Sequence, residues 1–147
     1  MNKLTQYQKG WLSGIIDGEG CISLIKEKRL YFKAGYTYKA RFNVGNTDLK
    51  LVKETQKIIG GGCIVKASKR FREDIGHKLF WNLDVSANII RDIFPQIKLI
   101  IKDEQRKLLL RALKILERHC GRSLPPRTNK EIKDLEKIYQ KIRELNK

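Results

Sequence analysis

The chain has 147 residues, 41% of them hydrophobic, which is enough to bury the core of one domain. Its 32 Lys and Arg residues outnumber its 16 Asp and Glu residues, and the net charge of +16 favours a polyanionic partner, with a basic ribosomal-type or thermophilic surface as the alternative. No apolar run is long enough to span a membrane, and the first residues lack the apolar segment of a signal peptide. We therefore expect an intracellular protein without a membrane partner.

The first predicted helix covers about Tyr7 to Asp17 and has two different faces. Leu12, Ile15 and Ile16 have the spacing of a buried helical stripe. Gly14 and Gly18, four residues apart, form a face that is nearly without side chains. Two acids, Asp17 and Glu19, follow at the end of this helix. A buried helix followed by an ordinary glycine-rich turn is one interpretation. The other is a helix whose bare face lets a second helix approach, so that acids from the two helix ends form a carboxylate pair.

Strands and helices alternate along the rest of the chain. The expected elements are strands from Cys21 to about Phe32 and from Tyr36 to Val44, a helix capped by Thr47 or Asp48 and ended by Gly60 to Gly62, strands from Cys63 to Ser68 and from His77 to Val85, a short helix from Ser86 to Phe94 closed by Pro95, a long helix from about Lys102 to His119, and an amphipathic helix from Asn129 after Pro125 and Pro126. We therefore predict an α+β protein with one domain over residues 1–121. Residues 122–147 are predicted to be a linker and a helix packed on that domain.

Metal-binding and nucleophile motifs that depend on cysteine or histidine are missing from the sequence. Cys21, Cys63 and Cys120 lack the paired spacing of a zinc site, and His77 and His119 do not complete one. We expect reduced, mostly packed thiols. The run Gly60 to Gly62 is not followed by the Lys and Ser or Thr of a phosphate-binding loop.

The segment Leu12-Ser13-Gly14-Ile15-Ile16-Asp17-Gly18-Glu19-Gly20 resembles the helix motif of the LAGLIDADG homing endonucleases, in the single-motif form. The resemblance extends over about residues 5–119, because the predicted elements follow the αββαββα order of that fold. It implies a four-stranded antiparallel sheet, saddle-shaped, with helices on one face and a basic surface on the other. Such a sheet fits the major groove of double-stranded DNA.

A single motif implies a homodimer, since one chain supplies only half of the acid pair. The expected interface residues are Ser13, Gly14, Asp17 and Gly18. An isologous dimer of this kind reads a pseudo-palindromic target.

The resemblance also implies an active site that hydrolyses phosphodiester bonds. Glu19 occupies the position of the metal-binding acid, where Asp is usual, and Gly18 offers its carbonyl to Mg²⁺, with Mn²⁺ as a substitute. Asp17 is expected to cap a helix end across the dimer interface. Lys102 is expected to stabilise transition-state charge or to raise the electrostatic potential near the attacking water, and Asn46 is expected to orient a water. The alternatives are a solvated helix start for Lys102 and a strand-end turn for Asn46.

Polar and basic residues on the predicted strands and turns are the candidate DNA contacts. They are Lys26, Lys28, Arg29, Lys33, Thr37, Lys39, Arg41, Asn43, Lys66, Ser68, Arg70 and Arg72. A charged strand is also commonly just a solvated edge. Two other functions are compatible with the same fold: a maturase that binds intron RNA, and a DNA-binding regulator without catalysis. Glu19 together with Lys102 favours the nuclease, because a binding protein has no evident need for an acid directed at phosphates.

Overall fold

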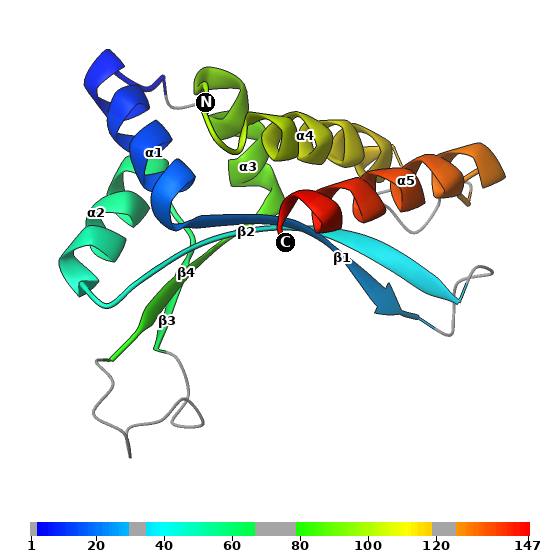
Figure 1. Ribbon diagram of the computed structural model, residues 1–147, viewed down its shortest axis with the longest axis horizontal. Helices are drawn as coiled ribbons and strands as arrows, with labels where there is room; N and C mark the ends of the chain where they lie inside the picture. Colours follow the sequence, from blue (N-terminus) through cyan, green and yellow to red (C-terminus); the bar gives the residue numbers. More distant parts are fainter. Residues whose placement is uncertain (1–2, 30–34, 67–78, 119–125) are drawn as a thin grey trace. The chain divides into compact units, whose positions relative to one another are not determined.

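The computed structural model describes residues 3–29, 35–66, 79–118 and 126–147, and Figure 1 shows its helices and strands. In chain order they are α1 (Gln6–Glu19), β1 (Gly20–Lys28), β2 (Tyr36–Asn46), α2 (Leu49–Ile59), β3 (Cys63–Lys66), β4 (Trp81–Val85), α3 (Ala87–Ile93), the 3₁₀ helix η2 (Phe94–Gln96), α4 (Asp103–Glu117) and α5 (Asn129–Leu145). The predicted α+β class and the αββαββα order, which runs from α1 to α3, are confirmed.

The four strands form one antiparallel sheet in the order β1-β2-β4-β3. Strands β2 and β4 are paired so that Val44 lies opposite Leu83, and β3 continues the sheet with Ile64 opposite the same Leu83. Along β2 the side chains of Tyr38, Ala40, Phe42 and Val44 are buried, whereas Lys39 and Arg41 between them are exposed. The predicted alternation of a buried and a polar face on this strand is therefore confirmed.

The chain divides into two compact units, and each is built from segments distant in sequence. One unit contains Met1–Cys21 and Phe42–Lys102, and the other contains Ile22–Arg41 and Asp103–Lys147. The long strands β1 and β2 contribute to both units. The predicted boundary at residue 121 stays a prediction.

In the first unit, apolar side chains from helices and strands form a common core. Phe42 of β2 contacts Phe94 of η2 edge to face, with ring centroids 5.0 Å apart. Leu12 and Ile16 of α1 and Val52 of α2 are fully buried. Helix α2 begins at the predicted cap Asp48, whose carboxylate accepts from Lys50 N at 2.8 Å, and ends at Gly60 in the left-handed conformation, φ 81°.

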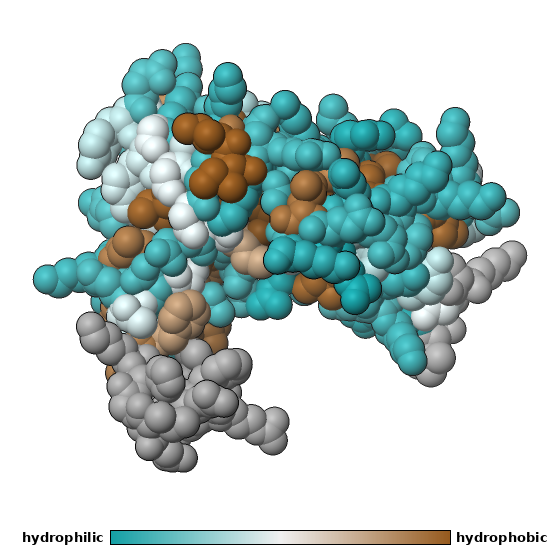
Figure 2. All heavy atoms as spheres, in the orientation of Figure 1, coloured by the Kyte–Doolittle hydropathy of each residue, from teal (hydrophilic) through white to brown (hydrophobic). Residues whose placement is uncertain are grey.

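In the second unit, α4 and α5 pack together beside the segments of β1 and β2 that belong to it (Figure 1). Leu109 and Leu113 of α4 and Leu135 and Ile142 of α5 are buried. The Asn146 side chain, just after α5, donates to the carbonyl of Ile22 at 2.9 Å. The surface over α4 and α5 is mainly hydrophilic in Figure 2, because their outward stripes consist of exposed residues that are mostly lysine and arginine.

Three local expectations differ from the structure. Strand β4 begins at Trp81 in the described residues, after Leu79 and Phe80, which are exposed and not in a strand. Pro95 was predicted to close the short helix, but it lies within the 3₁₀ helix η2. Its fixed φ suits the first turn of a helix. Cys21 and Cys63 are exposed free thiols, so the expectation of packed cysteines is wrong for these two.

No helix in the described part of the chain combines the length and the apolar character that crossing a membrane requires.

Candidate active site at the end of the first helix

Helix α1 is fixed at both ends by local sequence. At its start, Thr5 and Gln8 form a capping box, with Gln8 N donating to Thr5 Oγ1 at 3.2 Å and Thr5 N donating to Gln8 Oε1 at 2.9 Å. At its end, the N–H of Gly20 donates to the carbonyl of Ile16. A Cβ atom on Gly20 would lie 2.6 Å from that carbonyl oxygen, so glycine is needed where the helix turns into β1.

Glu19 is the last residue of α1 and is exposed. Within the described residues its carboxylate has no hydrogen-bond or ion-pair partner, and Gly18 beside it is also exposed. No group of three or more His, Cys, Asp or Glu side chains suited to a metal ion occurs in the described residues. At the end of α1 the described residues therefore offer one carboxylate without a partner, that of Glu19, and nearby main-chain oxygens. This donor set fits Mg²⁺, which is commonly held by one or two carboxylates together with waters and substrate phosphates.

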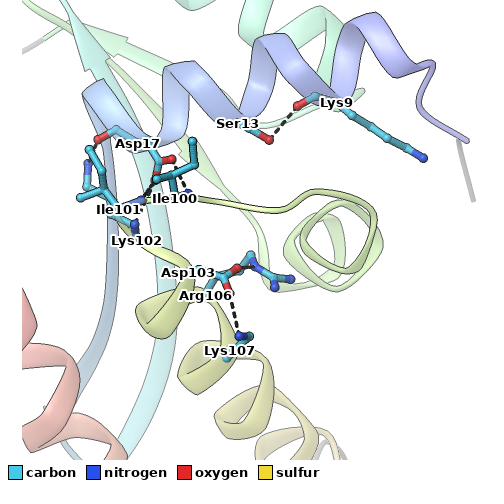
Figure 3. A network of polar contacts seen from close by, with 9 residues as sticks. All are labelled: Lys9, Ser13, Asp17, Ile100, Ile101, Lys102, Asp103, Arg106 and Lys107. Carbon is cyan, nitrogen blue, oxygen red and sulfur yellow. Dashed lines mark hydrogen bonds and ion pairs between the residues drawn. The ribbon is translucent and has the colours of Figure 1, made fainter.

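The Asp17 carboxylate binds the segment that precedes α4 (Figure 3). Its carboxylate accepts from the backbone N–H groups of Ile100 at 2.7 Å, Ile101 at 3.2 Å and Lys102 at 2.9 Å. Both of its oxygens are thus used within one chain. The expected contact of Asp17 with a second subunit stays a prediction.

Lys102, in the same segment, donates hydrogen bonds to the end of α1. Its Nζ donates to the backbone carbonyls of Ile16 at 3.1 Å, Asp17 at 2.8 Å and Gly20 at 2.7 Å. The side chain is half-buried, so the alternative of a fully solvated helix start does not describe it. The structure places the Lys102 side chain at the end of α1, where its contacts are to backbone oxygens, and its role at the transition state stays a prediction.

Asn46 ends β2, opposite Trp81 of β4. Its Oδ1 accepts from the backbone N–H of Asp48 at 2.8 Å, which stabilises the turn into α2. This contact matches the strand-end alternative for Asn46, and its predicted role in orienting a water stays a prediction.

The glycine face of α1 is open. A Cβ atom added at Gly10, Gly14 or Gly18 would meet nothing within 4 Å in the described chain, and all three residues are exposed. Ser13 is half-buried and donates to the carbonyl of Lys9 at 2.8 Å (Figure 3), a contact inside the helix. Ile100 and Ile101 are also exposed, at 92% and 72% of their full areas.

The predicted DNA contacts fall into different positions. Lys39 and Arg41 are exposed on alternate positions of β2, while Thr37 and Asn43 in the same phase are half-buried. Thr37 Oγ1 accepts from Arg127 at 3.3 Å, and Asn43 donates to Asn82 Oδ1 at 3.3 Å. These four residues therefore lie on one side of β2, as the alternation of the sequence predicts.

Lys26 is on the opposite side of its strand from the one predicted. Its Nζ lies 2.7 Å from Glu136 Oε2 of α5 and 4.0 Å from the ring centroid of Tyr36. Ile22 and Leu24, in the same phase of β1, are buried, so this is the side that packs on the helices. Lys28 shares that phase. The alternate residues Ser23, Ile25 and Glu27 were missed as candidates, although the buried Ile22 and Leu24 give their phase.

The remaining candidates are at strand ends or outside the described residues. Arg29 is exposed and pairs with Glu27 at 3.2 Å, and Lys66 is exposed at the end of β3. Lys33, Ser68, Arg70 and Arg72 lie outside the described residues.

Comparison with solved structures places the fold among homing endonucleases. The homing endonuclease I-CvuI, solved in complex with its target in the presence of calcium, superposes with a TM-score of 0.69 at 21% identity, over 95% of this chain and 82% of that one. The archaeal intron-encoded homing endonuclease I-Vdi141I, complexed with DNA, has a TM-score of 0.75 at 14% identity, over 96% and 85% of the two chains. I-SmaMI, bound to uncleaved DNA target with calcium ions, has a TM-score of 0.73 at 19% identity, and here the chain covers only 44% of its length.

Sequence comparison identifies the family of the chain. No curated protein matches the chain significantly. The model of the LAGLIDADG endonuclease family matches residues 12–106, a region that begins in α1, includes Asp17, Glu19 and Lys102, and ends in α4. Because that match covers more than half of the 147 residues, the chain belongs to the LAGLIDADG endonuclease family.

Proposed function

We propose that this protein is a homodimeric, sequence-specific endonuclease that cuts both strands of a long pseudo-palindromic DNA target with the help of a divalent metal ion. The observation that carries the proposal is Glu19, an exposed carboxylate without a partner in the described chain, at the end of the helix that bears the family motif. The net charge of +16 supports a polyanionic substrate. The DNA complexes of I-CvuI and I-Vdi141I support double-stranded DNA as that substrate.

Glu19 and the carbonyl of Gly18 would hold the metal ion, for which we propose Mg²⁺, with Mn²⁺ as a substitute. Both groups are hard oxygen donors, and they lie at the C-terminal end of a helix, where a cation is favoured. When bound, such an ion stabilises the charge that develops on the phosphate and increases the acidity of a coordinated water. Asn46, at the end of β2, would orient a water in the same site.

The open face of α1 supports association with a second copy. Gly10, Gly14 and Gly18 lie four residues apart on one exposed face, and glycine weakens a helix interior by about 1 kcal/mol relative to alanine. A second α1 that packs against this face would explain their presence, because only glycine lets two helix backbones approach closely. Pairing the two helices would also supply the second Glu19.

For DNA binding we propose the exposed side of β2, with Lys39 and Arg41 as its cations and Thr37 and Asn43 in the same phase. Arginine and asparagine can each make two hydrogen bonds to one base edge, and lysine is suited to phosphate contacts. Lys26 and Lys28 are left out of this surface because their phase of β1 faces α5.

The test is cleavage of a plasmid library that carries candidate insertion sites, with and without Mg²⁺, followed by sequencing of the linear products. Glu19→Gln keeps the size of the side chain and removes its charge, so cleavage should be lost while specific DNA binding in Ca²⁺ is retained. Glu54→Gln, at an exposed position of α2, is the matched control and should cut like the unmodified protein. Normal cutting by Glu19→Gln would remove Glu19 from the active site.

The alternative function is that of a maturase, which binds intron RNA. A protein that binds its intron RNA tightly and leaves every duplex uncut, with Mg²⁺ or Mn²⁺, would overturn the nuclease and favour the maturase.

A further inference from the structure

Two sets of hydrogen bonds run in opposite directions between the end of α1 and the segment before α4, and Figure 3 shows the contacts of Asp17 among them. Asp17 accepts from three consecutive backbone N–H groups, those of residues 100, 101 and 102. Lys102 donates to three backbone carbonyls, those of residues 16, 17 and 20. We call this pair of side chains and the backbone groups that they bind the clasp.

The clasp uses the whole donor capacity of Lys102. A lysine ammonium has three protons, and each of the three carbonyl oxygens lies within 3.1 Å of Nζ. A direct hydrogen bond from Lys102 to a DNA phosphate would therefore require one of these contacts to break. The charge already has a favourable place, because the carbonyls at a helix C-terminus carry the negative end of the helix dipole.

The three carbonyls lie on both sides of the proposed metal ligands in sequence. Residues 16 and 17 precede Gly18 and Glu19, and residue 20 follows them. Fixing these carbonyls fixes the turn from which the Gly18 carbonyl and the Glu19 side chain project. The backbone of Lys102 is in turn held by Asp17, at 2.9 Å, so the lysine is itself anchored to that turn.

We infer that Lys102 and Asp17 are positioning residues, which act on the metal site by holding the last turn of α1 and not by contact with the DNA. The inference rests on the proposed function, since it assigns the metal to Gly18 and Glu19. It gives Lys102 a role different from the transition-state contact that its place in the sequence predicts. Outer residues that orient metal ligands contribute about 10–100-fold to metal affinity or activity in other proteins.

The first experiment measures metal binding directly. Free Mn²⁺ is followed by electron paramagnetic resonance in a titration of the protein bound to a non-cleavable analogue of its DNA target, with folding checked by circular dichroism. Lys102→Met should raise the dissociation constant of Mn²⁺ by about tenfold. In parallel, most of its loss of cleavage at limiting Mg²⁺ should be recovered at saturating Mg²⁺, because the ligands themselves are intact.

Two other roles for Lys102 make different predictions. If the ammonium contacts the phosphate, Lys102→Met leaves Mn²⁺ affinity unchanged and lowers cleavage at every metal concentration. If the ammonium acts mainly as a like charge near the metal, its removal tightens Mn²⁺ binding. Either result overturns the inference. Lys98→Met, at an exposed lysine of the same segment, is the matched control and should leave the metal affinity unchanged.

Asp17→Asn tests the other half of the clasp. An asparagine keeps one acceptor oxygen but presents an NH₂ group to backbone N–H donors, so Mn²⁺ affinity should fall in the same direction as for Lys102→Met, by a smaller factor. Since the two side chains hold the same turn, the double variant should bind Mn²⁺ no more weakly than Lys102→Met. Effects that multiply would contradict a shared clasp.

Lys102→Arg keeps the inference testable if Lys102→Met does not fold. A guanidinium preserves the charge, but its planar donors cannot replace three protons on one nitrogen, so Mn²⁺ affinity should still be reduced. Full Mn²⁺ affinity in this variant would show that charge alone is needed and would overturn the inference. Failure of the proposed function looks different: the unmodified protein itself would neither bind Mn²⁺ with DNA nor cut.

Discussion

Glu136 connects α5 to the two strands beside it, and replacing it with glutamine tests how much that connection stabilises the protein. Its carboxylate accepts from Lys26 at 2.7 Å, from the Tyr38 hydroxyl and from Gln140 at 2.8 Å. The hydrogen bond from Lys26, then that from Tyr38, lowers the pKa of Glu136 from 4.5 to about 2 against the effect of its burial.

The size of the effect follows from the pKa and the exposure. At about 1.4 kcal/mol per pKa unit, the lowered pKa corresponds to about 3 kcal/mol. The Glu136 side chain is 32% exposed, so solvent screening reduces this, and we expect Glu136→Gln to lower the free energy of unfolding by about 1.5 kcal/mol at pH 7. With an unfolding entropy of about 2.1 cal/mol/K per residue over 147 residues, the melting temperature should fall by about 5 °C.

The stabilisation by Glu136 should depend on pH in a way that distinguishes it from other effects of the substitution. Because the folded pKa lies below the unfolded value, the stabilisation is complete above pH 4.5 and is lost as the pH falls through about 2. The difference in melting temperature between the two proteins should therefore shrink to less than half by about pH 3. Glu144→Gln, at an exposed position near the end of α5, is the control. A difference that is constant from pH 7 to 3, or equal to that of the control, would refute the reasoning.

Three further substitutions test the helix end, the open face and the strand surface. Gly20→Ala should destabilise the protein by about 1–3 kcal/mol in urea unfolding, because its Cβ would lie 2.6 Å from the Ile16 carbonyl oxygen, whereas Gly10→Ala meets nothing and should not destabilise it. Gly14→Leu should fold but sediment as a monomer without cleavage activity, and an unmodified protein that binds its target as a monomer would disprove the proposed homodimer. Arg41→Ala should weaken binding to the target duplex by about 1–3 kcal/mol if it contacts a base edge, measured by fluorescence anisotropy; unchanged affinity would remove it from the DNA surface.

Elements with local signals were predictable from the sequence. Asp48 caps α2 and Gly60 ends it, and both signals lie within a few residues of the helix end that they determine. The motif helix was predicted within two residues at each end, because Leu12 and Ile16 mark its buried side and Gly20 follows its last turn.

The side of β1 on which Lys26 lies was not predictable in the same way. Leu24 and Ile25 are adjacent apolar residues, so the sequence does not show which of them belongs to the buried phase. The packing of α5 decides it, through contacts between Lys26 and Glu136, which are 110 residues apart. For the same reason the sequence could not show that the Lys102 ammonium binds the end of α1, since the residues concerned are 82 to 86 positions apart.

The clasp has a consequence for the order in which the protein folds. Every hydrogen bond in it joins residues 82 to 86 positions apart, so the chain between them must be closed into a loop before any of these bonds can form. Contacts over such separations form late, because the entropy of loop closure opposes them until the intervening elements are in place. A nascent chain that ends before residue 100 lacks Lys102 and all three backbone N–H groups that bind Asp17, so the clasp could not hold the last turn of its motif helix. The end of α1 would therefore be held in place only after most of the chain has folded.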